Sequence, residues 1–213
     1  MHGERQNMRY NICMDEHEFD IPLNQEKNVR ADAARNRERL LKSAQRLFAD
    51  QGIEVVTMSA IAKDAGVGKG TLYRHFADKA AVCHALLDED MRVFQQQTLL
   101  ALQASSNEVN ALRWFLKEAT DYVVKHSDLL REVANQGGIE MLSHPAHIWW
   151  RQTILGLLER IAPQGDLSYL ADTFYAMLDV QTIRFQRRNL GYEVDRLQAG
   201  LDLLVDRLLC ESD

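Results

Sequence analysis

The stretch "DAGVGKGTLYRHF", residues 64 to 76, decides how the rest of the chain is interpreted. Its glycines, lysine and threonine are arranged much like the loop with which some nucleotide kinases hold ATP phosphates. That loop follows a buried strand and has its first glycine where this chain has Lys63. The apolar residues before it recur at helical spacing instead, at Met58, Ile61, Ala62 and Ala65. The sequence therefore argues against a nucleotide-binding loop.

The same stretch predicts two short helices joined by a turn. Gly66 can take the left-handed backbone that ends a helix, and Val67 can fold back onto the helix just finished. Leu72 and Phe76, four residues apart, mark the inner face of the next helix. Helix, glycine turn and helix form the helix-turn-helix arrangement, in which the second helix lies in the DNA major groove.

The charge distribution supports a DNA-binding segment within an acidic protein. The formal net charge of the whole chain is −6. Residues 30–76 contain nine Lys and Arg against five Asp and Glu, a balance of +4, which leaves −10 for the rest of the chain. A basic segment joined to an acidic remainder indicates contact with a polyanion at one end only.

Composition narrows the class of protein. The 213 residues are 46% hydrophobic with 3 prolines, enough for one or two domains with a core. No apolar run is long enough to cross a bilayer and no signal-peptide segment is evident, so we expect a cytoplasmic, nucleoid-associated protein. The three cysteines, Cys13, Cys83 and Cys210, lie far apart and predict neither disulfides nor a zinc site.

Apolar periodicity predicts an all-α fold of about nine helices and no strand. The three helices of the DNA-binding unit are expected at 35–51, 58–65 and 69–76, with Thr57 capping the second. The remaining helices are expected at 78–103, 108–126, 128–136, 146–161, 167–189 and 193–210. We divide the chain into a flexible acidic leader (1–29), a helix-turn-helix domain (30–78) and a helical ligand-binding and dimerisation domain (79–213).

The segment "RERLLKSAQRLFADQGIEVVTMSAIAKDAGVGKGTLYRHFADKAAV", residues 37 to 82, closely resembles the N-terminal signature of the TetR family of bacterial transcriptional regulators. The match combines the face of the first helix, the "TMSAIAKDAGV" helix and the "KGTLYRHFADK" run at fixed spacing. One departure is Gly68, where many members have a serine that caps the recognition helix. Glycine is a tolerable cap, so we expect a weaker helix start and no lost function.

The outer face of the recognition helix carries the candidate DNA contacts, which are Lys69, Gly70, Thr71, Tyr73 and Arg74. Lys69 at the helix start can meet a phosphate, and Gly70 allows close approach of a backbone. Arg74 has the forked donors that suit a guanine edge. The alternative for a single lysine or arginine is a solvated surface charge.

The resemblance adds three roles. It implies that the Tyr73 hydroxyl donates to a phosphate, and that Thr57 and Lys79 contact the DNA backbone beside the groove. Arg35, Arg37 and Arg39 are weighed evenly between phosphate contact and solvated charge. His75 is expected to be structural.

Apolar side chains in the C-terminal helices could wall a cavity for a small-molecule effector of unknown identity. The candidates are Trp114, Tyr122, Met141, Trp150, Phe174, Met177 and Phe185, for which ordinary core packing is the alternative. His144 and His147 flank Pro145, but two histidines without a nearby acid or cysteine are weak evidence for a metal. We predict no metal site and no cofactor.

The last two expected helices carry apolar stripes wider than one core-facing side needs, which predicts a homodimer. The interface candidates are Leu170, Phe174, Met177, Leu178, Leu197, Leu201, Leu204 and Leu208. Two recognition helices related by two-fold symmetry can reach successive major grooves, so the expected partner is double-stranded DNA with a palindromic operator.

The leading hypothesis is a ligand-responsive transcriptional regulator, with a repressor as the family's usual form. A DNA-bound factor that docks a protein, as in nucleoid occlusion, is the second hypothesis. An enzyme ranks last, because no grouping of nucleophile, base and orienting residue and no dinucleotide fingerprint is present.

Overall fold

A computed structural model describes residues 23–137, 145–161 and 165–209 of the chain. Within these residues every regular element is a helix, which confirms the predicted all-α class. The helices are α1 (Leu23–Gln51), α2 (Met58–Asp64), α3 (Lys69–His75), α4 (Lys79–Ala104), α5 (Glu108–Lys125), α6 (Ser127–Gly137), α7 (Pro145–Ile161), α8 (Leu167–Met177), α9 (Val180–Arg188) and α10 (Val194–Leu209).

The chain divides into two units by the density of its internal contacts, residues 1–35 and 36–213. The described part of the first unit is the beginning of α1, where Arg35 pairs with Asp32 one turn earlier at 3.1 Å. The second unit contains the rest of α1 and all the other helices. The domain limits expected at residues 29 and 78 stay predictions.

Helix α1 begins at Leu23, twelve residues before the expected start and inside the segment expected to be a flexible leader. Residues 23–34, "LNQEKNVRADAA", contain mostly good helix formers but no apolar stripe. Apolar periodicity detects only helices that bury one apolar face, so it does not predict a helical segment that lacks an apolar stripe. Residues 1–22 of the expected leader lie outside the described residues.

The single helix expected over 167–189 is divided into α8 and α9, so the described residues contain ten helices instead of nine. Leu178 and Asp179 close the end of α8 with backbone hydrogen bonds to Tyr175 and Ala176. The Asp179 carboxylate then accepts the amide of Thr182 at 2.8 Å and caps α9. A capping side chain thus starts a new helix where the apolar pattern continues unbroken.

The buried side chains of the helix-turn-helix unit form part of the hydrophobic core. Leu40 and Ala44 of α1 are fully buried, as are Ile61 of α2 and Leu72 of α3, and Phe76 after α3 is 3% exposed. The boundaries of α2 and α3 agree within one residue with those expected. Burial of these side chains stabilises α2 and α3, since helices of seven residues are not stable alone.

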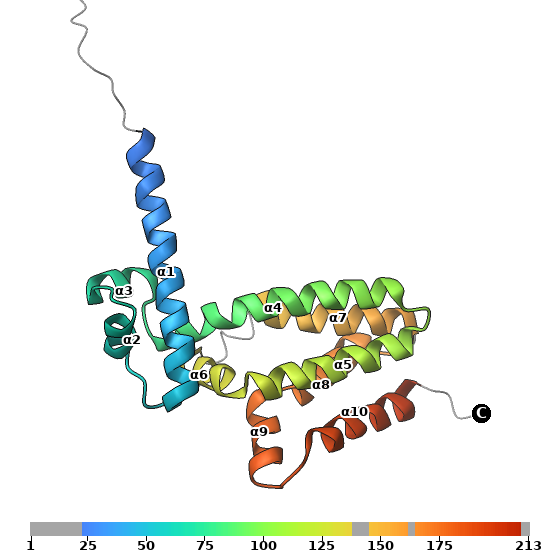
Figure 1. Cartoon of the computed structure of the whole chain (residues 1–213). Helices are drawn as coiled ribbons and strands as arrows, with labels where there is room; N and C mark the ends of the chain where they lie inside the picture. Colours follow the sequence, from blue (N-terminus) through green and yellow to red (C-terminus); the bar gives the residue numbers. More distant parts are fainter. Residues whose placement is uncertain (1–22, 138–144, 162–164, 210–213) are drawn as a thin grey trace, which may run out of the picture. The chain divides into compact units, whose positions relative to one another are not determined.

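Helix α5 lies at the centre of the C-terminal helices. It packs against α4, α6, α7, α9 and α10, and Figure 1 shows α10 running beside it. Leu112, Phe115 and Ala119 on its inner side are fully buried. Among the described helices, none combines the length and apolar character that a membrane span requires.

Candidate DNA-binding surface and ligand cavity

The turn before α3 is built as the sequence predicts. Gly66 has φ +62°, the left-handed backbone that favours glycine. Its amide donates to the Lys63 carbonyl at 3.2 Å, and the Val67 amide donates to the Ala62 carbonyl at 2.9 Å. These two bonds form a Schellman motif, which ends α2 and sets the direction of the chain into α3.

Helix α3 presents the predicted DNA contacts on its outward side. Leu72 is fully buried, whereas Lys69, Tyr73 and Arg74 are exposed. The exposed fraction of Tyr73 is 53%, which argues against a packing role for its ring. A Cβ added at Gly70 would meet no atom within 4 Å, so this side of the helix is open to close approach.

The N-terminus of α3 lacks a side-chain cap, as the glycine at this position predicts. Gly68 occupies the N-cap position with extended backbone and makes no side-chain hydrogen bond. The Arg74 guanidinium donates to the Thr71 hydroxyl at 3.1 Å and to the Gly70 carbonyl at 3.4 Å. Arg74 thus rests on its own helix, and both contacts are with residues that are themselves candidate DNA contacts.

Thr57 caps α2 as predicted, because its hydroxyl accepts the amide of Ala60 at 3.2 Å. Its side chain lies on the protein surface, where a DNA backbone contact stays a prediction.

Lys79 differs from the other candidates because its ammonium group already has protein partners. It donates to the Ile53 carbonyl at 2.8 Å and lies 3.6 Å from the Glu132 carboxylate. Its side chain is 19% exposed. The family resemblance implies a DNA backbone contact here, but the geometry gives the side chain a structural role inside the molecule.

Two arginines of α1 hold the helix-turn-helix unit together. Arg46 forms an ion pair with Asp64 at the end of α2, which holds the pKa of that carboxyl below its usual value. The Arg37 guanidinium lies over the Phe76 ring, 5.6 Å from its centroid, in a cation–π contact. Arg37 is therefore engaged with the core of the unit, which favours a structural role for this side chain.

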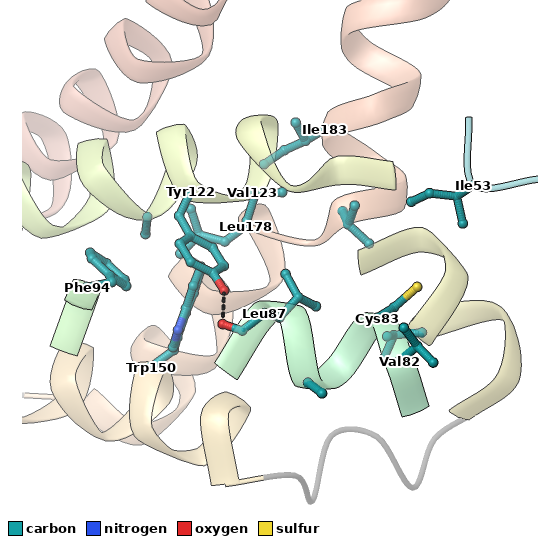
Figure 2. Packing of buried hydrophobic residues seen from close by; sticks show 14 of the residues in the cluster. Ile53, Val82, Cys83, Leu87, Phe94, Tyr122, Val123, Trp150, Leu178 and Ile183 are labelled. Atoms are coloured by element: carbon teal, nitrogen blue, oxygen red, sulfur yellow. Dashed lines mark hydrogen bonds between the residues drawn. The ribbon is translucent and has the colours of Figure 1, made fainter. Parts of the chain in front are cut away.

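The C-terminal helices line a cavity of about 760 Å³ that is partly open to solvent. Its wall comes from α4, α5, α6, α7 and α8, from the junction after α8 and from the start of α9. The volume is within the range of small-molecule sites. Figure 2 shows Tyr122 beside Trp150, with the Tyr122 hydroxyl donating to the Leu87 carbonyl at 3.3 Å.

Tyr122 and Trp150 of the predicted ligand residues line this cavity. Their rings meet edge to face, with centroids 5.6 Å apart, and the Trp150 indole donates to the Met91 sulfur at 3.4 Å. Burial of the Tyr122 phenol raises its pKa, so the hydroxyl stays protonated and acts as a donor. Both aromatic side chains are thus held in place by polar contacts at their edges.

Four other predicted ligand residues, Trp114, Phe174, Met177 and Phe185, do not line the cavity. Phe174 is 1% exposed and belongs to the core, and Trp114 and Met177 are partly buried against it. Phe185 is 55% exposed, so its assignment to a cavity wall is wrong. Met141 lies outside the described residues, as does His144.

The cavity also has polar lining residues that were not among the predicted ligand residues, although the sequence analysis considered His147 for a metal site. They are His84, Asp88, His147, Arg151, Gln152, Asp172, Tyr175, Asp179 and Thr182. Arg151 pairs with Asp172, and the His147 ring contacts the Tyr175 hydroxyl. Burial raises the pKa of Tyr175 to about 12. Within the described residues, no group of three or more His, Cys, Asp or Glu could hold a metal.

Some of the predicted interface residues are buried within the single chain, and the others have exposed surface. Phe174 and Leu178 are buried within the single chain, at 1% and 4% exposure, so they have no surface to offer a partner. Leu201 is 8% exposed, in the same helix as the fully buried Val205. Leu208 is 53% exposed, and the remaining residues Leu170, Met177, Leu197 and Leu204 are partly buried against the core.

Comparison with known proteins gives a specific match for the N-terminal helices. Residues 40–86 match the family described as bacterial regulatory proteins, tetR family. An HTH-type transcriptional regulator of Staphylococcus aureus strain USA300 is 44% identical over 66 residues, which are 31% of this chain and 36% of that protein. The chain thus spans about a third of the length of the curated relatives it matches.

Two solved structures resemble the whole fold. FadR of Thermus thermophilus, a TetR-family repressor in complex with lauroyl-CoA, has a TM-score of 0.66 and 20% identity, covering 83% of this chain and 97% of its own. A regulator from Saccharomonospora viridis in complex with choline has a TM-score of 0.64 and 21% identity, covering 83% and 98%. The comparisons thus identify residues 40–86 as the DNA-binding segment of the tetR family of bacterial regulatory proteins, and the solved structures share the all-helical fold.

Proposed function

We propose that this chain is a DNA-binding transcriptional regulator, a repressor in its simplest form, whose operator affinity changes when a small molecule occupies the cavity. In this proposal the protein has no catalytic activity and no cofactor. It acts in the cytoplasm, where it binds the DNA of the nucleoid. The observation that carries it is the outward face of α3, where Lys69, Tyr73 and Arg74 are exposed above the buried Leu72.

Binding to duplex DNA is supported by the chemistry of that face. A lysine near a helix start can neutralise a phosphate, and an arginine fork can bond two acceptors of a guanine. Arg74 exchanges its contacts with Thr71 and Gly70 for contacts with DNA at little cost, because the Arg74 side chain is exposed. Phosphate contacts set affinity, whereas base contacts set sequence preference.

The test is selection of bound fragments from genomic DNA, followed by mobility shifts at several salt concentrations. We expect Lys69→Ala to weaken binding to all sequences and to reduce the salt dependence by about one phosphate contact. Arg74→Ala should cost roughly 1 to 3 kcal/mol and relax base preference. Arg92→Ala is the control, since Arg92 is an exposed arginine of α4 paired with Glu89. Operator binding unchanged by both α3 substitutions would contradict the proposal.

Control by a ligand is supported by the position of α6. Leu130 and Val133 of this helix line the cavity. The two residues between them face other partners, since Arg131 pairs with Glu54 and Glu132 with Lys79. Glu54 lies in the turn that follows α1, and Lys79 begins α4. A ligand that shifts α6 can therefore alter contacts with the helix-turn-helix unit.

The two solved structures each contain a small molecule, which supports ligand binding in this fold. They do not indicate which effector this chain binds. One relative holds lauroyl-CoA and the other choline, which differ in charge and size. Ligand control requires different affinities for the DNA-bound and free conformations.

Dimerisation is part of the proposal, because one recognition helix of seven residues reads few base pairs. Two copies related by two-fold symmetry would place their α3 helices in successive major grooves, about 34 to 36 Å apart. A palindromic operator follows from that symmetry.

A further inference from the structure

The cavity wall carries an excess of negative charge. Among the described lining residues, the side chains with a fixed charge are Asp88, Arg151, Asp172 and Asp179. Three carboxylates face one guanidinium, so the wall has a formal charge of −2 when its imidazoles are neutral. The described wall contains no lysine.

The single cation of that wall is already neutralised. The Arg151 guanidinium bonds both carboxylate oxygens of Asp172, one of them at 3.2 Å. This pairing holds the pKa of Asp172 below its usual value and raises the pKa of Arg151. An anionic ligand would have to compete with Asp172 for this guanidinium and would face a wall of net negative charge, an effect that the partial exposure of the pair keeps modest.

The remaining wall suits an apolar body with a positive charge. Tyr122 and Trp150 offer aromatic rings, and a cation near such a ring is attracted by its electron-rich face. Leu87, Val123 and Val133 add aliphatic surface. Asp88 on α4 and Asp179 before α9 supply the negative charge, and both residues are exposed. One carboxylate oxygen of Asp179 also caps α9.

We propose that the effector of this cavity is a lipophilic cation, a molecule whose positive charge is spread over or shielded by aromatic or aliphatic groups. The inference rests on the proposed function, since it names the ligand class for the same cavity. A compact, strongly hydrated cation fits less well, because the apolar wall cannot replace its water.

The test uses two probes of the same shape and opposite charge, tetraphenylphosphonium and tetraphenylborate. Binding to the full chain is measured by calorimetry and thermal shift at pH 8, where an ordinary imidazole is neutral, in sodium buffer free of potassium. We expect tetraphenylphosphonium to bind about tenfold more tightly or better, given the excess charge. Equal binding of both probes, tighter binding of the borate, or binding of neither overturns the proposal.

Two substitutions in the ion pair should shift the preference in opposite directions. Asp172→Asn releases the charge of Arg151 and should weaken phosphonium binding about threefold while strengthening borate binding. Arg151→Gln leaves Asp172 without its guanidinium and should do the reverse. The factor is modest because both side chains are partly exposed, at 31% for Arg151 and 51% for Asp172.

Glu159→Gln is the matched control, because Glu159 is an exposed acid of the same helix α7 and does not line the cavity. It should leave both affinities unchanged. If the ion-pair substitutions acted only through loss of packing, the affinities for both probes would change in the same direction. That result would contradict the charge argument.

Mobility shifts with operator DNA separate this inference from the proposed function. Phosphonium binding that leaves operator affinity unchanged would count against the regulatory role of the cavity and leave its charge preference standing. Operator binding that responds to neutral or anionic compounds but not to the phosphonium would overturn the inference and keep the regulator.

Discussion

At the scale of single residues, Gly66 and Gly70 have different roles: the first allows a turn, and the second leaves space on the surface of α3. Gly66 needs its positive φ of +62°, and a Cβ there would lie 3.0 Å from the Arg39 guanidinium. Gly70 lies within α3, and a Cβ there would meet nothing within 4 Å. Glycine inside a helix lowers stability relative to alanine, so Gly70 is costly to the free protein and useful only when another backbone comes close.

Alanine substitutions distinguish the two glycines. Gly66→Ala should lower the free energy of unfolding by about 1 to 2 kcal/mol, since the left-handed backbone strains a side chain. Gly70→Ala should raise it by about 0.5 to 1 kcal/mol while weakening DNA binding. Urea denaturation and mobility shifts measure the two quantities on the same samples. A Gly70→Ala protein that is more stable and binds DNA as well as the wild type would remove Gly70 from the DNA surface.

At the scale of helices, Lys79 connects three elements. It lies in the first turn of α4, donates to the Ile53 carbonyl in the turn after α1, and pairs with Glu132 of α6. Asp78 caps the same helix by accepting the Ala81 amide at 2.8 Å. Lys79 and Glu132 are only 19% and 14% exposed, so solvent screens their interaction less than that of a surface pair.

Replacing Lys79 tests this connection. Lys79→Met should lower the free energy of unfolding by about 1 to 3 kcal/mol, because the Ile53 carbonyl and the Glu132 carboxylate both lose a donor. Lys42→Met is the control, since Lys42 pairs with Glu38 on the surface of α1 and such pairs contribute about 0.5 kcal/mol or less. Equal effects of the two substitutions in urea denaturation would show that the Lys79 contacts add nothing to stability.

At the scale of the whole molecule, α10 has one face on its own chain and another in solvent. Leu201 and Val205 are buried, and Arg113 of α5 pairs with Asp206 of α10. Leu208 is exposed, and Leu204 is partly buried at its side, one turn earlier. Because Leu201 is already buried within the chain, Leu197, Leu204 and Leu208 are the predicted interface residues of α10 that retain exposed surface.

Charged substitutions on that side should separate a dimer without unfolding its subunits. Leu204→Glu combined with Leu208→Glu is expected to give a monomer that keeps its helical circular dichroism and loses tight operator binding. Leu99→Glu on α4 is the control, because Leu99 is 58% exposed and lies outside the predicted interface. Light scattering that finds the unsubstituted protein monomeric at concentrations where it binds operator tightly would falsify the dimer.

The helix-turn-helix unit was predictable because its determinants are local. The helix-ending glycine at Gly66, the threonine cap at Thr57 and the inward pair Leu72 and Phe76 all lie within twenty residues. Such signals depend on backbone conformation and helical spacing, which the order of residues fixes directly. The early start of α1 and the division after α8 escaped prediction because neither alters the apolar pattern.

The sequence by itself determined the all-α class, the position of the recognition helix and the residues on its exposed side. Tertiary structure alone decided which inward-facing residues line a cavity and which form solid core, as the contrast between Trp150 and Phe174 shows. Helical periodicity reports that a side chain points inward but not what it meets there. The pairing of Arg151 with Asp172, which sets the charge of the cavity wall, joins two helices and depends on how they pack.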